Sequence, residues 1–369
     1  MRIIAGGENT LEWKEMDSLT IRKPDDWHVH LREGAILNAV LPYTERVFGR
    51  AIVMPNLATP VVKTHDARMY REEILARRAN EAFTPLMTLY LTDETDPRDV
   101  EEGVKSGIVT AVKYYPKNAT THSVSGVTDI TRTYPVLSIL QERGTPLLMH
   151  GESVEKDGVA VEPADREKVF LEGTLPTLIK DFPELKIVLE HASTKDAVEF
   201  VQARDSNLLA STITVHHLIL TEHDAKGDAH LSCMPVVKTD RDRAALRKAA
   251  TSGDAHFFLG TDSAPHPVSK KLGALPPAGI FSAPAALEMY AGVFEEENAL
   301  SNLESFASLN GPAFYGLPAN TATVSLYKKA WTPTDIDTSD GEMLRPLGDR
   351  ADREHGIAVQ WSATSEETR

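Results

Sequence analysis

The sequence is poor in cysteine and has no long apolar stretch. Its single cysteine, Cys233, cannot form an intrachain disulfide and cannot by itself build a cysteine zinc site, and it fits a reducing compartment. No uninterrupted apolar run approaches the ~20 residues that a membrane-spanning helix needs. Residues 1–15 contain no apolar core of signal-peptide length. These absences predict a soluble, cytoplasmic protein.

Positive charge is also scarce. The chain has 39 Lys and Arg against 54 Asp and Glu, which gives a net charge of −15. An acidic surface argues against nucleic acid or an anionic membrane as a partner. The composition, 41% hydrophobic and 25% charged, is typical of a folded protein, and 369 residues is the size of one decorated α/β barrel.

Short apolar runs alternate with amphipathic segments along the chain. We predict eight strands, at residues 18–22 continuing into 27–31, and at 50–54, 85–91, 108–114, 146–150, 186–191, 208–215 and 256–260. Helical periodicity marks residues 66–82, 166–180, 194–203 and 240–251, among others. Strands that alternate with helices pair in parallel, and eight such units predict a (β/α)8 barrel of the TIM type.

An open doubly wound sheet is the alternative fold. Its nucleotide-binding forms carry a glycine-rich loop after the first strand, whereas Gly6-Gly7 precedes the first predicted strand and lacks the GxGxxG spacing. We therefore favour a barrel that forms a single domain over residues 1–369, with its core at residues 18–317. Residues 318–369 are polar and rich in turn residues, and we expect them to form a peripheral C-terminal extension.

Imidazole, amine and carboxylate side chains fall at the predicted carboxyl ends of strands, where barrels carry their chemistry. His28 and His30 are two residues apart on a strand, so both point to the same side and can bind one metal ion. Four further strands end in Lys113, His150, His191 and Asp262. Any one of them alone is most simply a satisfied polar side chain or an ion pair. Their joint occurrence indicates a shared metal site.

The other histidines have different predicted places. His216 and His217 end the seventh predicted strand, and because adjacent strand residues point in opposite directions, at most one of them faces the site, where it would support the ligands. Five others fall in predicted loops or helix starts and are expected at the surface: His65, His122, His223, His230 and His355.

Neutral imidazole and carboxylate ligands suit zinc. His28, His30 and Asp262 can hold one ion, and His150 and His191 a second. Two dications about 3.5–4 Å apart need an anionic bridge, yet the fourth strand ends in Lys113 rather than an acidic residue. Burial favours the free amine, which can add carbon dioxide to give a carbamate with the two oxygens of a carboxylate. We therefore predict that Lys113 is an N6-carboxylysine that bridges two zinc ions.

Such a site would hydrolyse amides or esters. A water molecule shared by two zinc ions loses a proton near neutral pH and becomes a hydroxide nucleophile. Asp262 would take up a proton from this hydroxide and deliver it to the leaving nitrogen, as general base and then general acid.

The segments that carry these residues resemble the signature segments of the dihydroorotases, a family of the amidohydrolase superfamily. The two most specific are Asp26-Trp-His28-Val-His30-Leu-Arg32-Glu-Gly34 and Gly260-Thr-Asp262-Ser-Ala-Pro-His266, with Lys271 five positions on. Further matches are Val53-Met-Pro-Asn56, Ala111-Val-Lys113-Tyr-Tyr-Pro116, Asn118-Ala-Thr120-Thr121, His150-Gly-Glu152, Glu190-His191 and Asn310-Gly-Pro-Ala-Phe-Tyr-Gly316. The resemblance covers roughly residues 18–317 and is greatest to the short monofunctional type.

This resemblance implies the reversible cyclisation of N-carbamoyl-L-aspartate to L-dihydroorotate in de novo pyrimidine synthesis. It implies the same two zinc ions, carbamylated Lys113 and acid/base Asp262. The substrate carboxylate would be held by Arg32, Asn56 and His266, under a mobile loop with Thr120 and Thr121, and beside backbone groups of Met234 and Ala278. Arg32 lies two residues beyond His30 and so on the same side of the strand; the simpler alternative is a surface ion pair with Glu33. Members of this type are often homodimers, so we expect one here.

The sequence departs from the family pattern at a few places. Glu33 stands where Asp is frequent, Met234 stands where Leu is expected, and the chain beyond residue 317 resembles little. Other cyclic amidases (dihydropyrimidinase, hydantoinase, allantoinase) share the metals but have less need of Arg32 and Asn56. A deaminase would dispense with the bridging lysine. An inactive homologue would lack ligands, whereas all six ligand positions are filled here.

Overall fold

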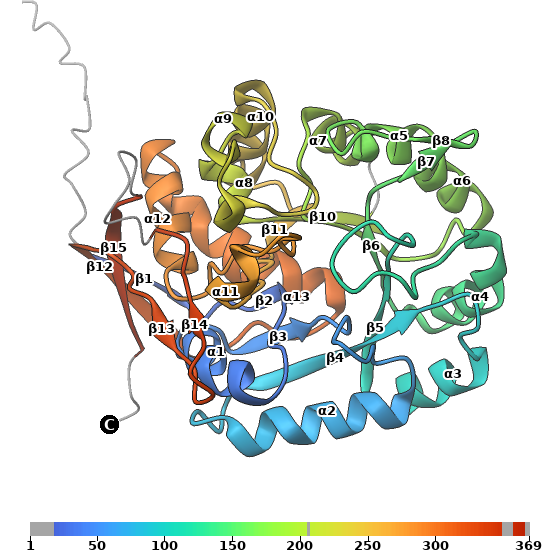
Figure 1. Cartoon of the computed structure of the whole chain (residues 1–369), viewed down its shortest axis with the longest axis horizontal. Coiled ribbons are helices and arrows are strands. Elements are labelled where there is room, and N and C mark those ends of the chain that lie inside the picture. The colour runs from blue at the N-terminus through green and yellow to red at the C-terminus, as the bar shows by residue number, and fades with distance from the viewer. Residues whose placement is uncertain (1–17, 205–206, 349–356, 366–369) are drawn as a thin grey trace, which may run out of the picture.

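The computed structural model describes residues 18–204, 207–348 and 357–365, and its centre is a barrel of parallel strands surrounded by helices (Figure 1). In sheet order the eight strands are β2 (Asp26–Val29), β3 (Arg50–Val53), β4 (Thr84–Leu91), β5 (Val109–Tyr114), β6 (Leu147–His150), β9 (Ile187–Glu190), β10 (Leu209–Ile213) and β11 (Phe257–Leu259). Each strand pairs in parallel with the next. The predicted TIM-type barrel is confirmed.

The barrel closes where its first and last strands meet. A parallel bridge joins Val29 to Ser263. On either side of it, the Asp262 N–H donates to His28 O (2.8 Å) and the His30 N–H donates to Ser263 O (3.0 Å). The backbone segments that close the barrel therefore also carry three of the predicted metal ligands, so closure of the sheet brings those ligands together.

Side chains inside the barrel form two layers: an apolar layer toward the amino ends of the strands and a polar layer at their carboxyl ends. Alternate residues of a strand point to the same face, so Lys113 follows Ala111 and His150 follows Leu148 on the inside. The apolar layer consists of Trp27, Ile52, Met54, Ala111, Leu148, Val188, Ala210, Phe258 and Phe314. It closes the lower part of the barrel and leaves the carboxyl ends of the strands for the polar groups.

Helices cover the outside of the barrel. The longer ones are α1 (Gly34–Val47), α2 (Thr64–Arg77), α3 (Pro97–Lys105), α4 (Tyr134–Arg143), α5 (Arg166–Glu172), α6 (Thr174–Asp181), α7 (Lys195–Gln202), α10 (Asp240–Thr251) and α12 (Ala286–Glu296). Shorter ones are α8 (Val215–Ile219), α9 (Glu222–Ala225), α11 (Val268–Lys271) and α13 (Asn310–Tyr315). In α10, Thr239 and Asp242 form a reciprocal N-terminal cap. None of the helices in the described ranges has the length and apolarity to cross a bilayer.

Three sequence-based predictions about segments are wrong. Residues 18–22 do not belong to the barrel, because β1 (Ser18–Arg22) pairs antiparallel with β12 (Thr323–Trp331) in a separate three-stranded sheet with β15 (Val359–Ser365). The helix expected at 166–180 is broken at Gly173 into α5 and α6. The seventh strand ends at Ile213 rather than at residue 215, because the Thr214 side chain accepts a hydrogen bond from the His217 N–H and starts α8.

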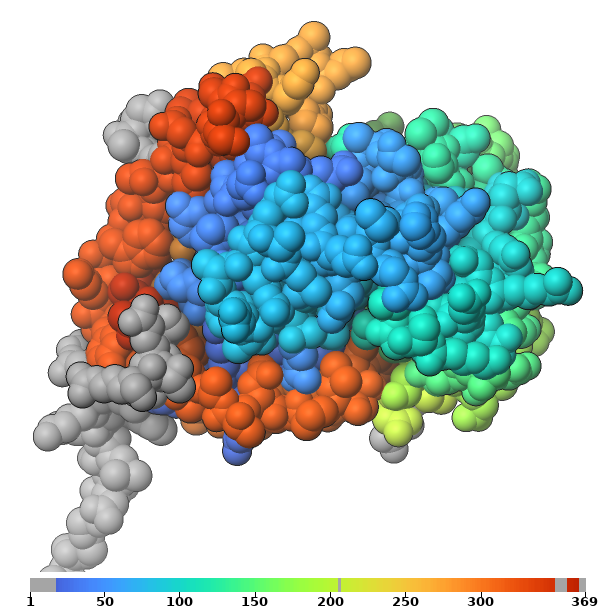
Figure 2. Space-filling model, turned by 90° about the horizontal axis from the view of Figure 1, so that it is seen from below, coloured from blue at the N-terminus to red at the C-terminus, as the bar shows by residue number. Residues whose placement is uncertain are grey.

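The chain beyond Leu317 packs against the barrel and its loops. Arg46 of α1 donates to Ala363 O of β15 (3.0 Å). The hairpin of β13 (Ile336–Asp337) and β14 (Met343–Leu344) reaches the segment after β11, where Leu344 bridges to Pro267. In Figure 2 these orange-red segments lie against the blue part of the barrel and beside the gold segment that follows β11. The C-terminal residues therefore brace the segment that carries Asp262 and His266.

Gly311 provides a direct test of packing at the closed end of the barrel. A Cβ atom at Gly311 would lie 1.9 Å from Trp27 Nε1, whereas one at Gly292 of α12 would meet nothing within 4 Å. We expect Gly311→Ala to lower the free energy of unfolding by about 1–3 kcal/mol through overpacking. Gly292→Ala should raise it by about 0.5–1 kcal/mol, because alanine stabilises a helix interior. Urea unfolding followed by circular dichroism measures both changes; equal values for the two variants would contradict this packing.

Candidate active site

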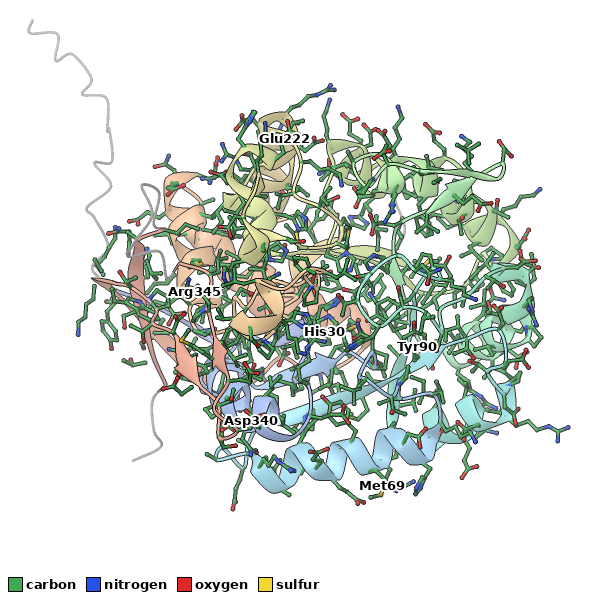
Figure 3. The ribbon with its side chains drawn as sticks, viewed as in Figure 1. His30, Met69, Tyr90, Glu222, Asp340 and Arg345 are labelled. Atoms are coloured by element: carbon green, nitrogen blue, oxygen red, sulfur yellow. The ribbon has the colours of Figure 1, made fainter. Side chains whose placement is uncertain are left out.

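The six predicted metal ligands converge inside the mouth of the barrel. Five of them line one cavity: His28, His30, His150, His191 and Asp262. The sixth, Lys113, is fully buried and close enough to change the electrostatic environment of His28, His150 and His191. In Figure 3, His30 lies at the centre of the ring of strands, whereas Met69 and Glu222 lie at the periphery of the molecule.

The ligand atoms form two adjacent groups. In the first, His28 Nε2 and His30 Nε2 lie 3.3 Å and 3.0 Å from Asp262 Oδ1, an arrangement that can hold a metal ion. In the second, His150 Nδ1 lies 3.2 Å from His191 Nε2. The two groups are neighbours, because the rings of His28 and His191 are 5.1 Å apart between centroids.

Carboxylates behind the histidines orient their rings. His28 Nδ1 donates to Glu190 Oε2 (2.6 Å), which also accepts from the Thr212 hydroxyl (2.7 Å). His150 Nε2 donates to Glu152 Oε2 (2.7 Å). When the ring is neutral, each bond leaves a lone pair on the other ring nitrogen, which is Nε2 in His28 and Nδ1 in His150. This is the usual arrangement of metal-binding histidines, in which a carboxylate fixes the tautomer.

Burial sets the protonation states of these groups. It lowers the pKa of His30 to about 3 and lowers the pKa values of His150 and His191, so these imidazoles are neutral near pH 7. Burial acts to raise the pKa of Asp262, but its contacts with His28 and His30 hold that pKa well below its usual range. Neutral imidazoles beside an ionised carboxylate are the donor set that zinc requires.

Lys113 is buried without a hydrogen-bond partner. Its side chain is 0% exposed, and its Nζ contacts no acceptor within the described ranges, lying 5.1 Å above the ring of Tyr115. Burial lowers the pKa of Lys113 to about 8, although the charges of Glu190 and Asp262 oppose this shift. A buried polar group without a partner costs free energy, so its presence among the ligands requires an explanation.

Arg32 is a second buried cation that lacks an anion. It is 8% exposed and donates through Nε to Pro265 O (3.2 Å), while Nη2 lies 3.1 Å from His266 Nε2. Among the described residues no carboxylate forms an ion pair with it, so the surface pair with Glu33 does not form. Burial, with Arg32 and Lys271 adding to it, lowers the pKa of His266 to about 2. The pair presents a guanidinium and a neutral imidazole to the cavity region.

The loop with Thr120 and Thr121 lies over the cavity. Asn56 Nδ2 donates to Thr121 O (3.2 Å), and the Thr121 hydroxyl donates to Ala278 O (3.1 Å). Of the seven predicted substrate-binding residues, six line the cavity: Arg32, Asn56, Thr120, Thr121, Met234 and Ala278. The seventh, His266, contacts both Arg32 and Ala278. The structure thus brings all predicted site residues together.

Three site residues have an unusual backbone conformation. Arg32, His191 and Asp262 have φ values of 59°, 44° and 44°, a left-handed region that non-glycine residues seldom adopt. Neighbours hold them there: the Tyr70 hydroxyl donates to Arg32 O (2.7 Å), and the His191 N–H donates to Thr212 Oγ1 (2.7 Å). Such strain is common where side chains must be aimed at a site.

Several residues of the site were not predicted. Glu152, Glu190 and Thr212 orient histidines, and the Tyr115 hydroxyl is buried at the cavity without a partner in the described part of the chain. Glu152 and Glu190 do fall next to His150 and His191 in the motif segments, which is the signal that could have found them. Thr212 can be identified only when the neighbouring strands are known. It lies in β10, and its two partners are Glu190, the last residue of β9, and His191, which follows that strand.

The remaining histidines do not line the cavity. His216 and His217 lie in α8, where His217 binds the Thr214 hydroxyl (2.7 Å) and Pro235 O (3.1 Å). These two and Cys233 bring three potential ligand atoms together, but those of His217 and Cys233 have partners within the protein. His65, His122 and His223 are exposed as predicted, whereas His230 is half-buried. His355 and Gly6-Gly7 lie outside the described residues.

Comparison with known proteins identifies the family of this chain. Residues 25–332 match the model of the amidohydrolase family. The dihydroorotase of Parasynechococcus marenigrum is 54% identical over 320 residues, which is 85% of this chain and 92% of that protein. The dihydroorotase of Hahella chejuensis is 50% identical over 94% of this chain and 99% of its own length.

A solved structure agrees with these sequence relatives. The crystal structure of dihydroorotase from Saccharomyces cerevisiae, in complex with 5-fluoroorotic acid, superposes with a TM-score of 0.88 at 33% identity and covers 95% of this chain and 99% of that one. The family match at residues 25–332 includes the barrel and every segment that carries a site residue. The chain therefore belongs to the amidohydrolase family and, within it, to the dihydroorotases, which are hydrolases of cyclic amides.

Proposed function

We propose that this enzyme catalyses the reversible cyclisation of N-carbamoyl-L-aspartate to L-dihydroorotate in pyrimidine synthesis, with two zinc ions per subunit. The observation that carries this proposal is the buried Arg32, which has no carboxylate partner among the described residues and lies beside the metal-ligand groups. A cation in such a place needs an anion, and both substrates carry a carboxylate that takes no part in ring closure.

The donor set fits two zinc ions. His28, His30 and Asp262 would hold one ion, and His150 and His191 the other. Lys113 would supply the anionic bridge. Its neutral amine would add to the carbon of carbon dioxide, so that one N–C bond would form as the electron pair of one C=O π bond moves to oxygen, and one proton would leave to solvent. The product is a carbamate with one negative charge. The Nζ atom of Lys113 has no hydrogen-bond partner among the described residues, which supports this assignment. In the carbamate this nitrogen would be bonded to carbon and would no longer be a buried charged or unpaired amine.

When bound, zinc would activate water and polarise the amide carbonyl. Asp262 would accept a proton from that water and transfer it to the ring nitrogen that leaves, and in cyclisation the same carboxylate would act in reverse. Its position between His28 and His30, with its pKa held low, keeps the carboxylate available as a base. Glu190 and Glu152 would keep the histidine tautomers fixed throughout.

The substrate carboxylate would bind to Arg32, Asn56 and His266. Thr120 and Thr121 would cover it, and backbone groups of Met234 and Ala278 would hold the ring amide. The hydantoinase and dihydropyrimidinase alternatives act on rings without this carboxylate, and for them a buried unpaired Arg32 has no use. We further propose a cytoplasmic homodimer with one domain per chain, on the basis of the family resemblance.

The substrate comparison is the first test of this proposal. Purified, zinc-loaded protein should interconvert N-carbamoyl-L-aspartate and L-dihydroorotate and prefer them to dihydrouracil and its ring-opened product. Because cyclisation consumes one proton, the ratio of ring to open form at equilibrium should fall about ten-fold for each unit of rising pH. Ultraviolet absorbance of the ring amide measures both. Preference for dihydrouracil would contradict the proposal.

Lys113→Ala tests the bridge. We expect it to lower the second zinc equivalent and to reduce kcat by about 10³-fold or more, because two ions without a bridge repel each other. Short carboxylic acids should restore part of the activity by taking the place of the carbamate. Lys117→Ala, which removes an exposed lysine near the same strand end, is the control and should match the wild type. Full activity of Lys113→Ala without an added acid would exclude a bridging role.

Arg32→Met tests the carboxylate clamp. We expect an increase of about 10²-fold in KM for dihydroorotate, since a charge-assisted bidentate contact is lost, with zinc content unchanged. Any residual activity on dihydrouracil should change far less. Arg68→Met, at an exposed position of α2, serves as the matched control. Steady-state kinetics with metal analysis give the result, and an unaltered KM for dihydroorotate would remove Arg32 from the clamp.

A further inference from the structure

Lys271 is a buried lysine outside the metal site, and its ammonium group contacts backbone carbonyls alone. It is the last residue of α11 and is 3% exposed. Its Nζ donates to Gly279 O (2.8 Å), Pro277 O (3.0 Å) and Ser232 O (3.2 Å). An ammonium group has three N–H donors, so these three carbonyls satisfy it completely. No carboxylate in the described part of the chain forms an ion pair with Lys271, so no neighbouring anion neutralises its positive charge.

The three carbonyls belong to the two segments whose backbone lines the cavity. Pro277 and Gly279 flank Ala278, and Ser232 lies two residues before Met234. A direct bond from the Gly279 N–H to Ser232 O (2.8 Å) joins the same two segments. Lys271 therefore joins two chain segments that are more than 40 residues apart in the sequence.

These bonds fix the orientation of both peptide planes around Ala278. In a trans peptide the C=O and N–H groups point in opposite directions, so binding of Pro277 O to Lys271 turns the Ala278 N–H away from the lysine. The next plane is held through Ala278 O, which accepts from the Thr121 hydroxyl (3.1 Å) and lies 3.0 Å from His266 Nε2. A small residue is required beside it, because a Cβ at Gly279 would lie 2.7 Å from Ala264 O.

Lys271 also strengthens the positive potential at the proposed carboxylate clamp. Arg32 and Lys271 are close enough to interact electrostatically, and both charges act on His266. Neither cation has a carboxylate partner among the described residues. The cluster is therefore built to receive an anionic group from outside the protein, with Arg32 facing the cavity and Lys271 behind the backbone that lines it.

We propose that Lys271 is a positioning residue for substrate binding: by holding three carbonyls it presents the backbone groups of Ala278 and Met234 to the ring amide and carboxylate of the substrate. This inference rests on the proposed function, because it takes dihydroorotate and N-carbamoyl-L-aspartate as the ligands. It differs from a purely structural role, which would lower stability and activity together without changing the recognition of the substrate.

Lys271→Met tests the proposal, since methionine keeps most of the aliphatic stem and removes all three donors. We expect KM for dihydroorotate to rise about ten-fold or more, while kcat falls less than about three-fold and zinc content stays at the wild-type value. Lys270→Met removes the exposed lysine one position earlier on the same short helix and should match the wild type. Equal KM values for Lys271→Met, Lys270→Met and the wild type would overturn the proposal.

A second variant covers the case in which Lys271→Met does not fold. Lys271→Arg keeps the charge but places its donors on a planar group that cannot match three converging carbonyls, so its KM should lie between those of the wild type and Lys271→Met. An unchanged KM for a folded Lys271→Arg beside an unfolded Lys271→Met would assign Lys271 to stability alone and refute the positioning role. If the wild type itself does not turn over dihydroorotate, the proposed function is wrong. If the wild type is active and the Lys271 variants keep its KM, only the positioning role is wrong.

Discussion

The amine of Lys113 lies at the end of β5, fully enclosed, with no hydrogen-bond partner in the described residues. Proteins seldom bury a polar atom in this way, because the lost interaction with water is not replaced. Around it lie the neutral imidazoles of His30, His150 and His191 and the ionised Asp262, a donor set for which the proposed pair of metal ions would need one bridging anion. A carbamate on Lys113 would supply that anion, and the other residues of the site would hold the metals and the substrate around it.

The fold produces this arrangement through two simple features. Alternation along each strand places polar groups one layer above the apolar interior of the barrel, so Lys113 and His150 lie inside and at the same end. Closure of the sheet through the bonds between His28, Asp262, His30 and Ser263 then brings the first and last strands into contact. The strained φ values at Arg32, His191 and Asp262 turn those side chains toward the centre as the chain leaves the strands.

Much of this could be predicted from the sequence, for identifiable reasons. The strand ends were recognisable because Lys113, His150, His191 and Asp262 each follow a short apolar run, and period-two alternation indicates which residues point inward. The barrel followed from the alternation of strands and helices. The substrate-binding residues came from the resemblance rather than from spacing, since Asn56, Thr121 and Ala278 belong to separate loops and only the folded chain places them together.

Other features depend on information that one sequence does not carry. Residues 18–22 have the pattern of a strand, but the choice of β12 as their partner depends on contacts about 300 positions away. Thr214 ends β10 early because its hydroxyl caps α8, a local competition between strand and helix that hydrophobic pattern does not reveal. The roles of Thr212 and Lys271 depend on which backbone groups happen to face them, so neither residue type nor spacing could have indicated them.

Carbon-13 NMR of the zinc-loaded enzyme prepared with ¹³C-labelled bicarbonate detects the carbamate itself rather than its consequences. The wild type should show one protein-bound carbamate signal per subunit, and this signal should be lost in Lys113→Ala and in protein stripped of metal. A fully active enzyme that shows no such signal would contradict a carbamate on Lys113, and the buried amine would then need another explanation.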